Sequence, residues 1–227
     1  MKLIPAVLAF GSGALLALDG GAALADESSG QISAPALPAV TRALEIGVAG
    51  GYAQGTGDIG DGMGGVGDLS GAGGTGELQL GYRVIPRLTL GVYGSFSGYS
   101  KGDDVGTGTE VLGAQAGIRA DWHFLPAETL DPWVGLSTGW RGLWLTPDVG
   151  KNTSLQGFEL ARLQVGLDYR ITPEVAISPV LGASVSMFVS QDGPGQADYQ
   201  DIDNPQANVF FFAGLLGRFD VLGDRVR

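Results

Sequence analysis

The side chains able to carry reaction chemistry are few. The chain contains a single histidine, His123, and no cysteine. One imidazole excludes a multi-histidine metal centre, and without cysteine there is no disulfide, thiolate metal site or cysteine nucleophile. His123 lies three residues before Pro126, beside a short turn, and we interpret it as a polar residue of that turn. We expect no catalytic residues, no metal site and no cofactor.

Acidic residues accumulate in the long polar segments of the chain. Carboxylates in such segments can bind Ca²⁺ or Mg²⁺, and Asp201 and Asp203 alternate around one apolar residue, but the order of an EF-hand loop is absent. We expect solvated acidic loops, with divalent cations as candidate partners. The aspartates are Asp58, Asp61, Asp68, Asp103, Asp104, Asp148, Asp192, Asp198, Asp201 and Asp203.

Half of the segment from Gly55 to Asp68 is glycine. A phosphate-binding loop would need a following lysine and the start of a helix. No lysine follows, and no helix is expected there. We therefore expect this segment to be a mobile loop.

Composition narrows the class of protein. The 227 residues include 40 glycines, only 16% are charged, and the net charge is −11. An acidic chain does not neutralise phosphates, so nucleic acid is excluded as a partner. After residue 25 no apolar run reaches the roughly 18 residues of a membrane-spanning helix.

The first 25 residues have the pattern of an export signal. Met1 and Lys2 precede an apolar stretch, and Ala23-Leu24-Ala25 forms a small-x-small cleavage site before Asp26. We expect cleavage after Ala25 and a location outside the cytoplasm. Residues 26–41 are polar and interrupted by prolines, which indicates a periplasmic leader without a packed element.

From residue 42 to residue 221 the dominant pattern is an alternation of apolar and polar residues. Such a two-residue period is typical of a β-strand with two unlike faces. It predicts eight strands, at residues 44–53, 78–84, 88–97, 112–124, 133–145, 162–170, 175–189 and 207–221. Pro179 interrupts the seventh, and we expect a bulge there or a strand that begins at Val180.

The charged residues indicate which face is inside. The apolar face is nearly free of charge, with only Glu110 and Glu159, which the strand lengths place near the edge of the hydrocarbon. This distribution favours a transmembrane barrel with its apolar face outward and paired charges filling the interior, although a narrow pore stays open as an alternative. The predicted interior network consists of Glu45, Arg83, Arg119, Asp121, Arg141, Arg162, Asp168, Arg170, Arg218 and Asp220.

Aromatic residues on the apolar face gather toward both ends of the strands, as interfacial girdles do. The predicted girdle residues are Tyr52, Tyr82, Phe96, Trp122, Trp140, Trp144, Tyr169, Phe211 and Phe219.

The connections support the same architecture. Three short, proline-bearing turns at residues 85–87, 125–129 and 171–174 alternate with the long segments 55–76, 101–108, 146–154 and 192–206. This asymmetry is typical of an outer-membrane barrel with both termini in the periplasm. It predicts an all-β, eight-stranded antiparallel up-and-down barrel over residues 42–221 and a periplasmic tail at 222–227.

In this architecture the chain resembles the small outer-membrane barrels of the OmpA/OmpX/OmpW type. Its last strand, residues 208–221, looks like the C-terminal signal that this family offers to the barrel assembly machinery, with Phe219 as the aromatic anchor. It departs from the family pattern at Gly217 and by continuing to Arg227. The resemblance implies location in the cell outer membrane, with outer-membrane lipid and lipopolysaccharide as partners.

We therefore expect a non-enzymatic outer-membrane barrel with a structural role or a surface interaction carried by its loops. The alternatives are a narrow channel or an OmpW-like conduit for small apolar solutes, a lipid-modifying enzyme that uses His123, and a soluble periplasmic calyx of lipocalin type. The calyx would require the apolar face to be inside.

Overall fold

The computed structural model describes residues 37–194 and 198–224. The predicted signal peptide and most of the predicted leader lie outside the described residues.

The eight predicted strands are confirmed, and most extend further than the alternation indicates. A four-residue helix and a two-residue strand accompany them in the described part of the chain. Within that part, no helix is both long and apolar enough to cross a membrane. The elements are β1 (Leu44–Thr56), α1 (Val66–Leu69), β2 (Ser70–Ile85), β3 (Leu88–Lys101), β4 (Glu110–His123), β5 (Leu130–Thr146), β6 (Thr153–Thr172), β7 (Val175–Asp192), β8 (Gln200–Asp201) and β9 (Ala207–Val221).

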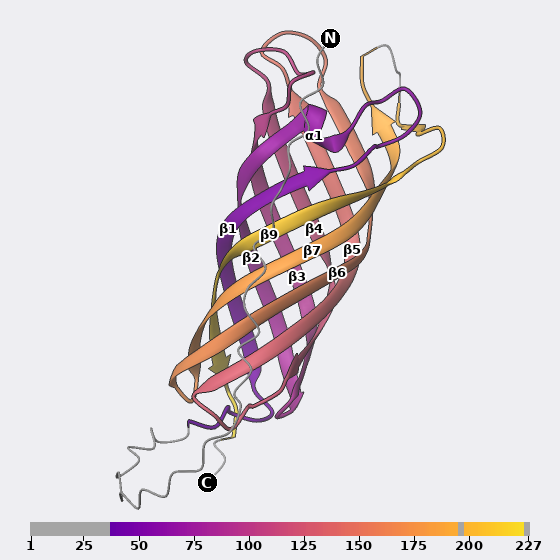
Figure 1. Ribbon diagram of the computed structural model, residues 1–227. Helices are drawn as coiled ribbons and strands as arrows, with labels where there is room; N and C mark the ends of the chain where they lie inside the picture. The colour runs from indigo at the N-terminus through magenta and orange to yellow at the C-terminus, as the bar shows by residue number, and fades with distance from the viewer. Residues whose placement is uncertain (1–36, 195–197, 225–227) are drawn as a thin grey trace, which may run out of the picture. The chain divides into compact units, whose positions relative to one another are not determined.

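The strands form one closed antiparallel barrel (Figure 1). Each long strand pairs with its neighbours in sequence, β9 pairs with both β7 and β1, and the β6–β7 pairing completes the ring. The short β8 adds only two pairs to the end of β7. Because closure pairs the backbone of every long strand on both sides, the sheet has no open edge, which is the condition lipid imposes on a β-structure.

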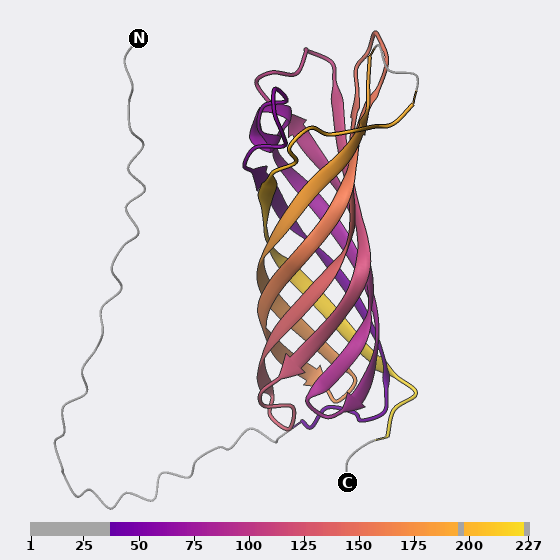
Figure 2. The ribbon, with the colours of Figure 1, turned by 90° about the vertical axis from the view of Figure 1, so that its right-hand side faces the viewer.

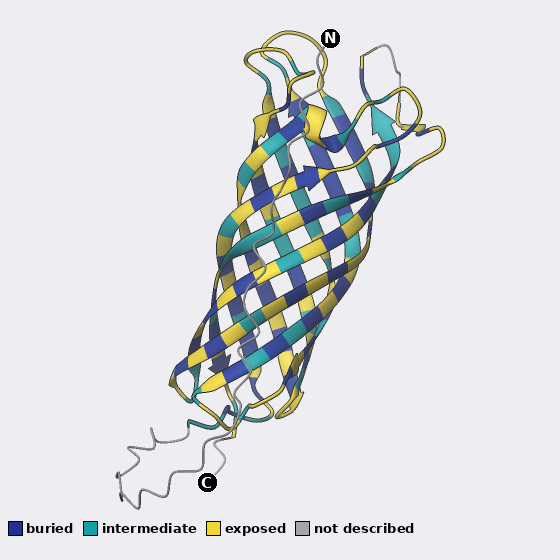
Figure 3. Cartoon of the chain, viewed as in Figure 1, coloured by how far each residue is buried: buried dark blue, intermediate teal, exposed yellow. Residues whose placement is uncertain are grey.

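Side chains alternate between the two faces of this wall (Figure 3). Ile118 is 63% exposed and Leu136 is 60% exposed on the outside, whereas Arg83 is fully buried on the inside. The apolar face is therefore outward, as the charge distribution predicts. A soluble calyx would need the opposite arrangement.

The prediction that Glu159 faces outward is wrong, because a β-bulge inverts the alternation within β6. A register shift leaves two consecutive β6 residues, Leu160 and Ala161, opposite the single Thr138 of β5. Both of these residues face outward. Glu159 on one side of the bulge and Arg162 on the other consequently both point into the lumen, where both are buried.

The prediction of a bulge or a late strand start at Pro179 is also wrong. β7 begins at Val175, and its register with β9 is continuous from Val175 to Met187. On the opposite side, the pairing with β6 skips the two positions between Val180 and Ile177. The strand thus accommodates the missing proline N–H through a local gap in one ladder.

The two ends of the barrel differ in their connections (Figure 2). We call the end that carries the short β2–β3, β4–β5 and β6–β7 connections the turn end, and the opposite end the loop end. Ala39 and Val40 are buried at the turn end, where the Ala39 N–H donates to the Pro126 carbonyl (2.7 Å) and Thr41 pairs with Asp224. The part of the predicted leader that the structure describes, residues 37–41, is therefore packed against the barrel. We had expected a leader without a packed element.

Candidate functional site

The lumen holds the densest group of polar side chains in the described structure. All ten residues of the predicted interior network are buried there. The structure adds Glu77, His123, Asp131 and Glu159, so that six arginines and seven carboxylates share the interior with one imidazole. We divide them into a lower cluster toward the turn end and a central cluster at mid-barrel.

The lower cluster consists of Glu45, Arg83, Arg119, Asp121, His123, Asp131, Asp168, Arg170, Arg218 and Asp220. Arg218 of β9 is its hub. The Arg218 guanidinium contacts Glu45 at 2.5 Å and both Asp121 and Asp168 at 3.3 Å. It also lies over the Trp133 ring, 4.3 Å from the centroid. One cation thus joins four strands, because these partners come from β1, β4, β5 and β6.

Two other arginines of the lower cluster bridge its carboxylates. Arg83 lies 2.6 Å from Glu45 and 3.5 Å from Asp220. Arg170 lies 3.6 Å from Asp131 and 3.8 Å from Asp220. Shared partners make the cluster one network, in which the loss of any member leaves a neighbour's buried charge uncompensated.

The central cluster consists of Glu77, Arg141, Glu159 and Arg162. Arg162 pairs with Glu77 at 2.5 Å, and Arg141 pairs with Glu159 at 2.9 Å. The Tyr93 hydroxyl donates a hydrogen bond to Glu159. Arg119 of the lower cluster also lies 3.6 Å from Glu77 and so links the two clusters.

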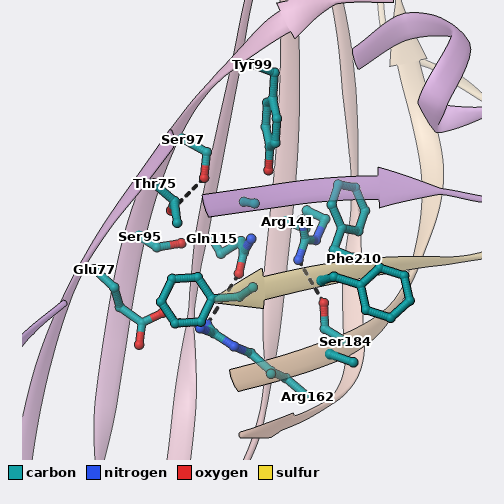
Figure 4. A pocket seen from close by; sticks show the side chains of 15 residues that line it. Thr75, Glu77, Ser95, Ser97, Tyr99, Gln115, Arg141, Arg162, Ser184 and Phe210 are labelled. Atoms are coloured by element: carbon teal, nitrogen blue, oxygen red, sulfur yellow. Dashed lines mark hydrogen bonds and ion pairs between the residues drawn. The ribbon is translucent and has the colours of Figure 1, made fainter. Parts of the chain in front are cut away.

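A small cavity borders the central cluster on the loop side (Figure 4). Its wall includes Arg141, Arg162 and Ser184, and the Arg141 guanidinium donates to the Ser184 hydroxyl at 3.0 Å. The cavity has a volume of about 20 Å³. This is room for about one or two water molecules. At this level side chains therefore fill the lumen almost completely.

Above the cavity an apolar layer covers the loop end. Its buried members come from the strands and from two loops, and the Arg141 guanidinium packs against it, 3.6 Å from the centroid of the Phe210 ring. We call this layer the apolar seal. It comprises Ala53, Ile59, Val66, Tyr99, Val111, Leu143, Leu145, Leu155, Phe188, Ile202 and Phe210.

The first loop contributes to this seal, contrary to the expectation of a mobile segment without a helix. Ile59 and Val66 are fully buried. The Val66 N–H donates to the Gly57 carbonyl (2.8 Å), and the Gln206 N–H of the last loop donates to the Ile59 carbonyl (2.9 Å). α1 begins at Val66, and the Asp68 carboxylate accepts from the Gly65 N–H at 2.8 Å. The loop thus folds over the mouth of the barrel.

His123 belongs to the lower cluster and is fully buried, as are its neighbours Asp131 and Asp168. Its Nδ1 atom lies 2.8 Å from Asp131 and 3.8 Å from Asp168. The Leu125 N–H donates to the other oxygen of Asp131 (2.9 Å). Among the described residues, these three are the only group of His, Asp and Glu ligands close enough together for a metal ion. The described loop aspartates, for which we expect solvated carboxylates, form no such group.

The nine predicted girdle residues all lie on the outer face. Seven are exposed, while Trp140 and Trp144 are half-buried and pack against one another with their ring centroids 5.9 Å apart. Tyr82, Trp122, Tyr169 and Phe219 pair near the turn-end limits of their strands. The fourth tryptophan, Trp133, points into the lumen, where its indole N–H donates to Ser178 at 3.0 Å.

Three lumen carboxylates escaped the sequence analysis. Glu77 shares the parity of Gln79 and Arg83 but precedes the predicted start of its strand. Asp131 likewise lies two residues before the predicted start of the fifth strand. If the predicted strands had been extended to their actual starts, the alternation would have placed both residues in the lumen. For Glu159 the alternation gives the wrong face, because of the bulge in β6.

Comparison with known proteins supports the fold. No protein-family model and no curated sequence matches the chain. Among solved structures, it is similar to Neisserial surface protein A, with a TM-score of 0.50 and 13% identity over 78% of this chain and 96% of that chain. It is also similar to the outer membrane protein OprG from Pseudomonas aeruginosa, with a TM-score of 0.48 and 13% identity over 79% of this chain and 98% of that one. A third is the outer membrane protein AlkL in DMPC lipid bilayers, with a TM-score of 0.48 and 12% identity over 91% and 100%.

At such low identity the likeness concerns the fold alone. The closed eight-stranded antiparallel barrel is the architecture that the resemblance to small outer-membrane barrels implies, and this prediction is confirmed. Its apolar outer face and charged, filled interior are what an integral barrel needs in lipid. The chain thus has the fold of the small outer-membrane barrels, and an outer-membrane location agrees with its surface.

Proposed function

We propose that this protein is a sealed, non-catalytic outer-membrane barrel whose role is structural or carried by its loops. The observation that supports this most strongly is the continuous filling of the lumen. The lower cluster, the central cluster and the apolar seal follow one another along the barrel axis, and the residues around Val40 cover the turn end.

Conduction through this lumen would require buried ion pairs to separate. Arg141 and Glu159 meet across the central cluster at 2.9 Å, and both are nearly inaccessible to solvent. Separating a buried pair leaves charges without partners, at a cost of about 3–5 kcal/mol. The filled interior therefore supports a structural barrel over a channel.

Catalysis by His123 is disfavoured by access. The imidazole is fully buried and faces two carboxylates. No substrate of lipid size could reach it, and a general acid or base must lie within hydrogen-bond reach of its substrate. The calyx alternative is disfavoured as well, because the apolar face is outside.

The expected partners follow from the surface. The exposed apolar belt would contact membrane lipid and the acyl chains of lipopolysaccharide. The last strand, β9, ends near the exposed Phe219 and would carry the signal for the assembly machinery. The acidic loops would interact with divalent cations through single, solvated carboxylates.

Planar-bilayer recording tests the proposal. The purified protein should give no stepwise conductance. A variant with Arg218→Ala, Arg141→Ala and Phe210→Ala should conduct, because it removes one large side chain from each of the three layers that fill the lumen. A matched variant truncated on the outer face, with Leu136→Ala, Phe158→Ala and Leu215→Ala, should stay closed.

Regular openings of the unmodified protein would contradict a sealed barrel. A conduit for apolar solutes would show differently, as solute uptake that a deletion strain loses and the intact gene restores.

A further inference from the structure

The small cavity between the central cluster and the apolar seal has a polar wall (Figure 4). Cavities that stay dry inside proteins are lined by apolar side chains, whereas five residues of this wall carry a hydroxyl group. They are Thr75 of β2, Ser95, Ser97 and Tyr99 of β3, and Ser184 of β7. This wall is therefore suited to a polar occupant.

Two of these hydroxyl groups have no hydrogen-bond partner in the described part of the chain. Ser97 donates to Thr75 at 2.8 Å, and Ser184 accepts from Arg141 at 3.0 Å. The hydroxyl groups of Ser95 and Tyr99 line the cavity without such a contact. Polar groups inside a protein are almost always hydrogen-bonded, to protein or to ordered water. The partner of these two hydroxyl groups should therefore lie in the cavity.

Arg162 supplies a donor from another wall of the lumen. Its Nη2 atom pairs with Glu77 at 2.5 Å, while its Nη1 atom reaches the Gln115 amide only at 3.5 Å. An ordinary N–H···O hydrogen bond is about 2.7–3.2 Å long, so Nη1 can make a second, shorter bond into the cavity. Because β4 and β5 separate β3 from β6 in the sheet, an occupant bound by Ser95 and Arg162 would bridge the lumen.

The size and charge of the cavity select the occupant. Its volume of about 20 Å³ admits about one or two water molecules. The charges around it are already balanced, because Arg141 pairs with Glu159 and Arg162 pairs with Glu77. A bound ion would add a buried charge without a counter-ion. The occupant should therefore be small and neutral.

We propose that this cavity is a binding site for internal water. A water molecule there accepts from Arg162 Nη1 and from the Tyr99 hydroxyl and donates to Ser95, which makes about three hydrogen bonds, as is usual for buried water. It ties β3 to β6 directly below the apolar seal. The site goes beyond the proposed function and rests on it only for the closed lumen, which keeps this water from exchanging rapidly with bulk solvent.

X-ray radiolysis of the mature protein in lipid nanodiscs tests the site. Radiolysis turns water into hydroxyl radicals, which oxidise the side chains beside the water, tyrosine among them. Tyr99 should be oxidised although it lies in the apolar seal. Tyr93 is the matched control and should be protected, because it is buried, does not line the cavity and donates its hydroxyl hydrogen to Glu159.

The isotope of the added oxygen separates internal water from bulk water. When the protein is mixed with H₂¹⁸O shortly before exposure, Tyr199, which is exposed in the last loop, should gain ¹⁸O. Tyr99 should still gain ¹⁶O from its slowly exchanging neighbour.

A substitution in the wall locates the water. Ser95→Val replaces the hydroxyl group by methyl groups that take up part of the cavity, and it should reduce the oxidation of Tyr99 to the level of Tyr93. Ser137→Val is the matched control. Ser137 is also buried in the lumen but does not line the cavity, so this variant should leave the oxidation of Tyr99 unchanged.

Three results would overturn the proposal. Oxidation of Tyr99 no greater than that of Tyr93 in the unmodified protein would mean a dry cavity, and the sealed barrel would stand. Immediate ¹⁸O on Tyr99 would mean access from bulk solvent, which contradicts the seal as well. An anomalous bromide peak in the cavity, in crystals grown with a bromide salt, would identify an anion site in place of water.

Discussion

Replacing Arg218 by alanine removes the cation on which three carboxylates of the lower cluster converge. Glu45, Asp121 and Asp168 would each lose a contact of 3.3 Å or less. Glu45 would keep Arg83 at 2.6 Å, while Asp168 would keep only the distant His123. The substitution also removes the guanidinium that lies over the face of the Trp133 ring.

The expected cost follows from these contacts. Removing one partner of a buried ion pair costs about 3–5 kcal/mol, and loss of a desolvated cation–π contact adds about 0.5–2 kcal/mol. Because the three carboxylates share one network, the terms do not simply add. We expect a loss of at least about 3 kcal/mol, which is a fall of more than about a hundredfold in the folding equilibrium constant.

Urea unfolding in lipid vesicles, followed by tryptophan fluorescence, measures this loss. Arg87→Ala is the matched control, because Arg87 is exposed and its removal should change stability by less than about 0.5 kcal/mol. Arg218→Lys should fall between the two, since it keeps the charge but loses the planar fork. A loss below about 1 kcal/mol for Arg218→Ala would refute the interpretation that the lower cluster is a tightly coupled network.

Three further substitutions probe other parts of the structure. Glu159→Leu should destabilise the barrel by about 3 kcal/mol because it leaves a buried arginine without its carboxylate partner. Glu110→Leu should be nearly neutral. Equal effects of the two substitutions in urea unfolding would place both residues on one face of the barrel wall. Leu163→Arg puts a charge on the lipid-facing wall and should cost about 2–4 kcal/mol, in contrast to Val149→Arg on an exposed loop, and equal stability would argue against lipid contact. Ile59→Asp buries a charge in the apolar seal and should speed proteolysis of the first loop while the barrel keeps its resistance to SDS; an unchanged cleavage rate would show that the loop does not pack there.

The architecture could be read from the sequence because it depends on a repeated local signal. Strands such as β4 alternate without interruption from Leu112 to Trp122, and lipid outside with charge inside makes the two faces chemically distinct. Strand ends were less predictable. β2 begins at Ser70, well before its alternation becomes visible, because the glycines from Gly71 to Gly76 give neither face a character and pairing with neighbours alone extends the strand.

The candidate site could be predicted only where that period holds. Ten lumen residues were identified by parity, but Glu159 was assigned to the wrong face, since one extra residue in β6 inverts the period and leaves no compositional mark. The apolar seal was missed for a different reason. Ile59 and Val66 are isolated apolar residues in a glycine-rich loop, and their burial depends on strands that are distant in sequence.

The most direct test of the inside-out barrel is nitroxide scanning across the β6 bulge, which the absence of cysteine makes possible without background labelling. Single cysteines would replace Phe158, Glu159, Leu163 and Gln164 in turn, and each labelled protein would be folded into lipid vesicles. Labels at 158 and 163 should be accessible to oxygen dissolved in the hydrocarbon, and labels at 159 and 164 should be shielded both from oxygen and from a water-soluble nickel complex. Oxygen access at 159 and 164 with shielding at 158 and 163 would contradict the account and return the molecule to a barrel with its apolar face inside.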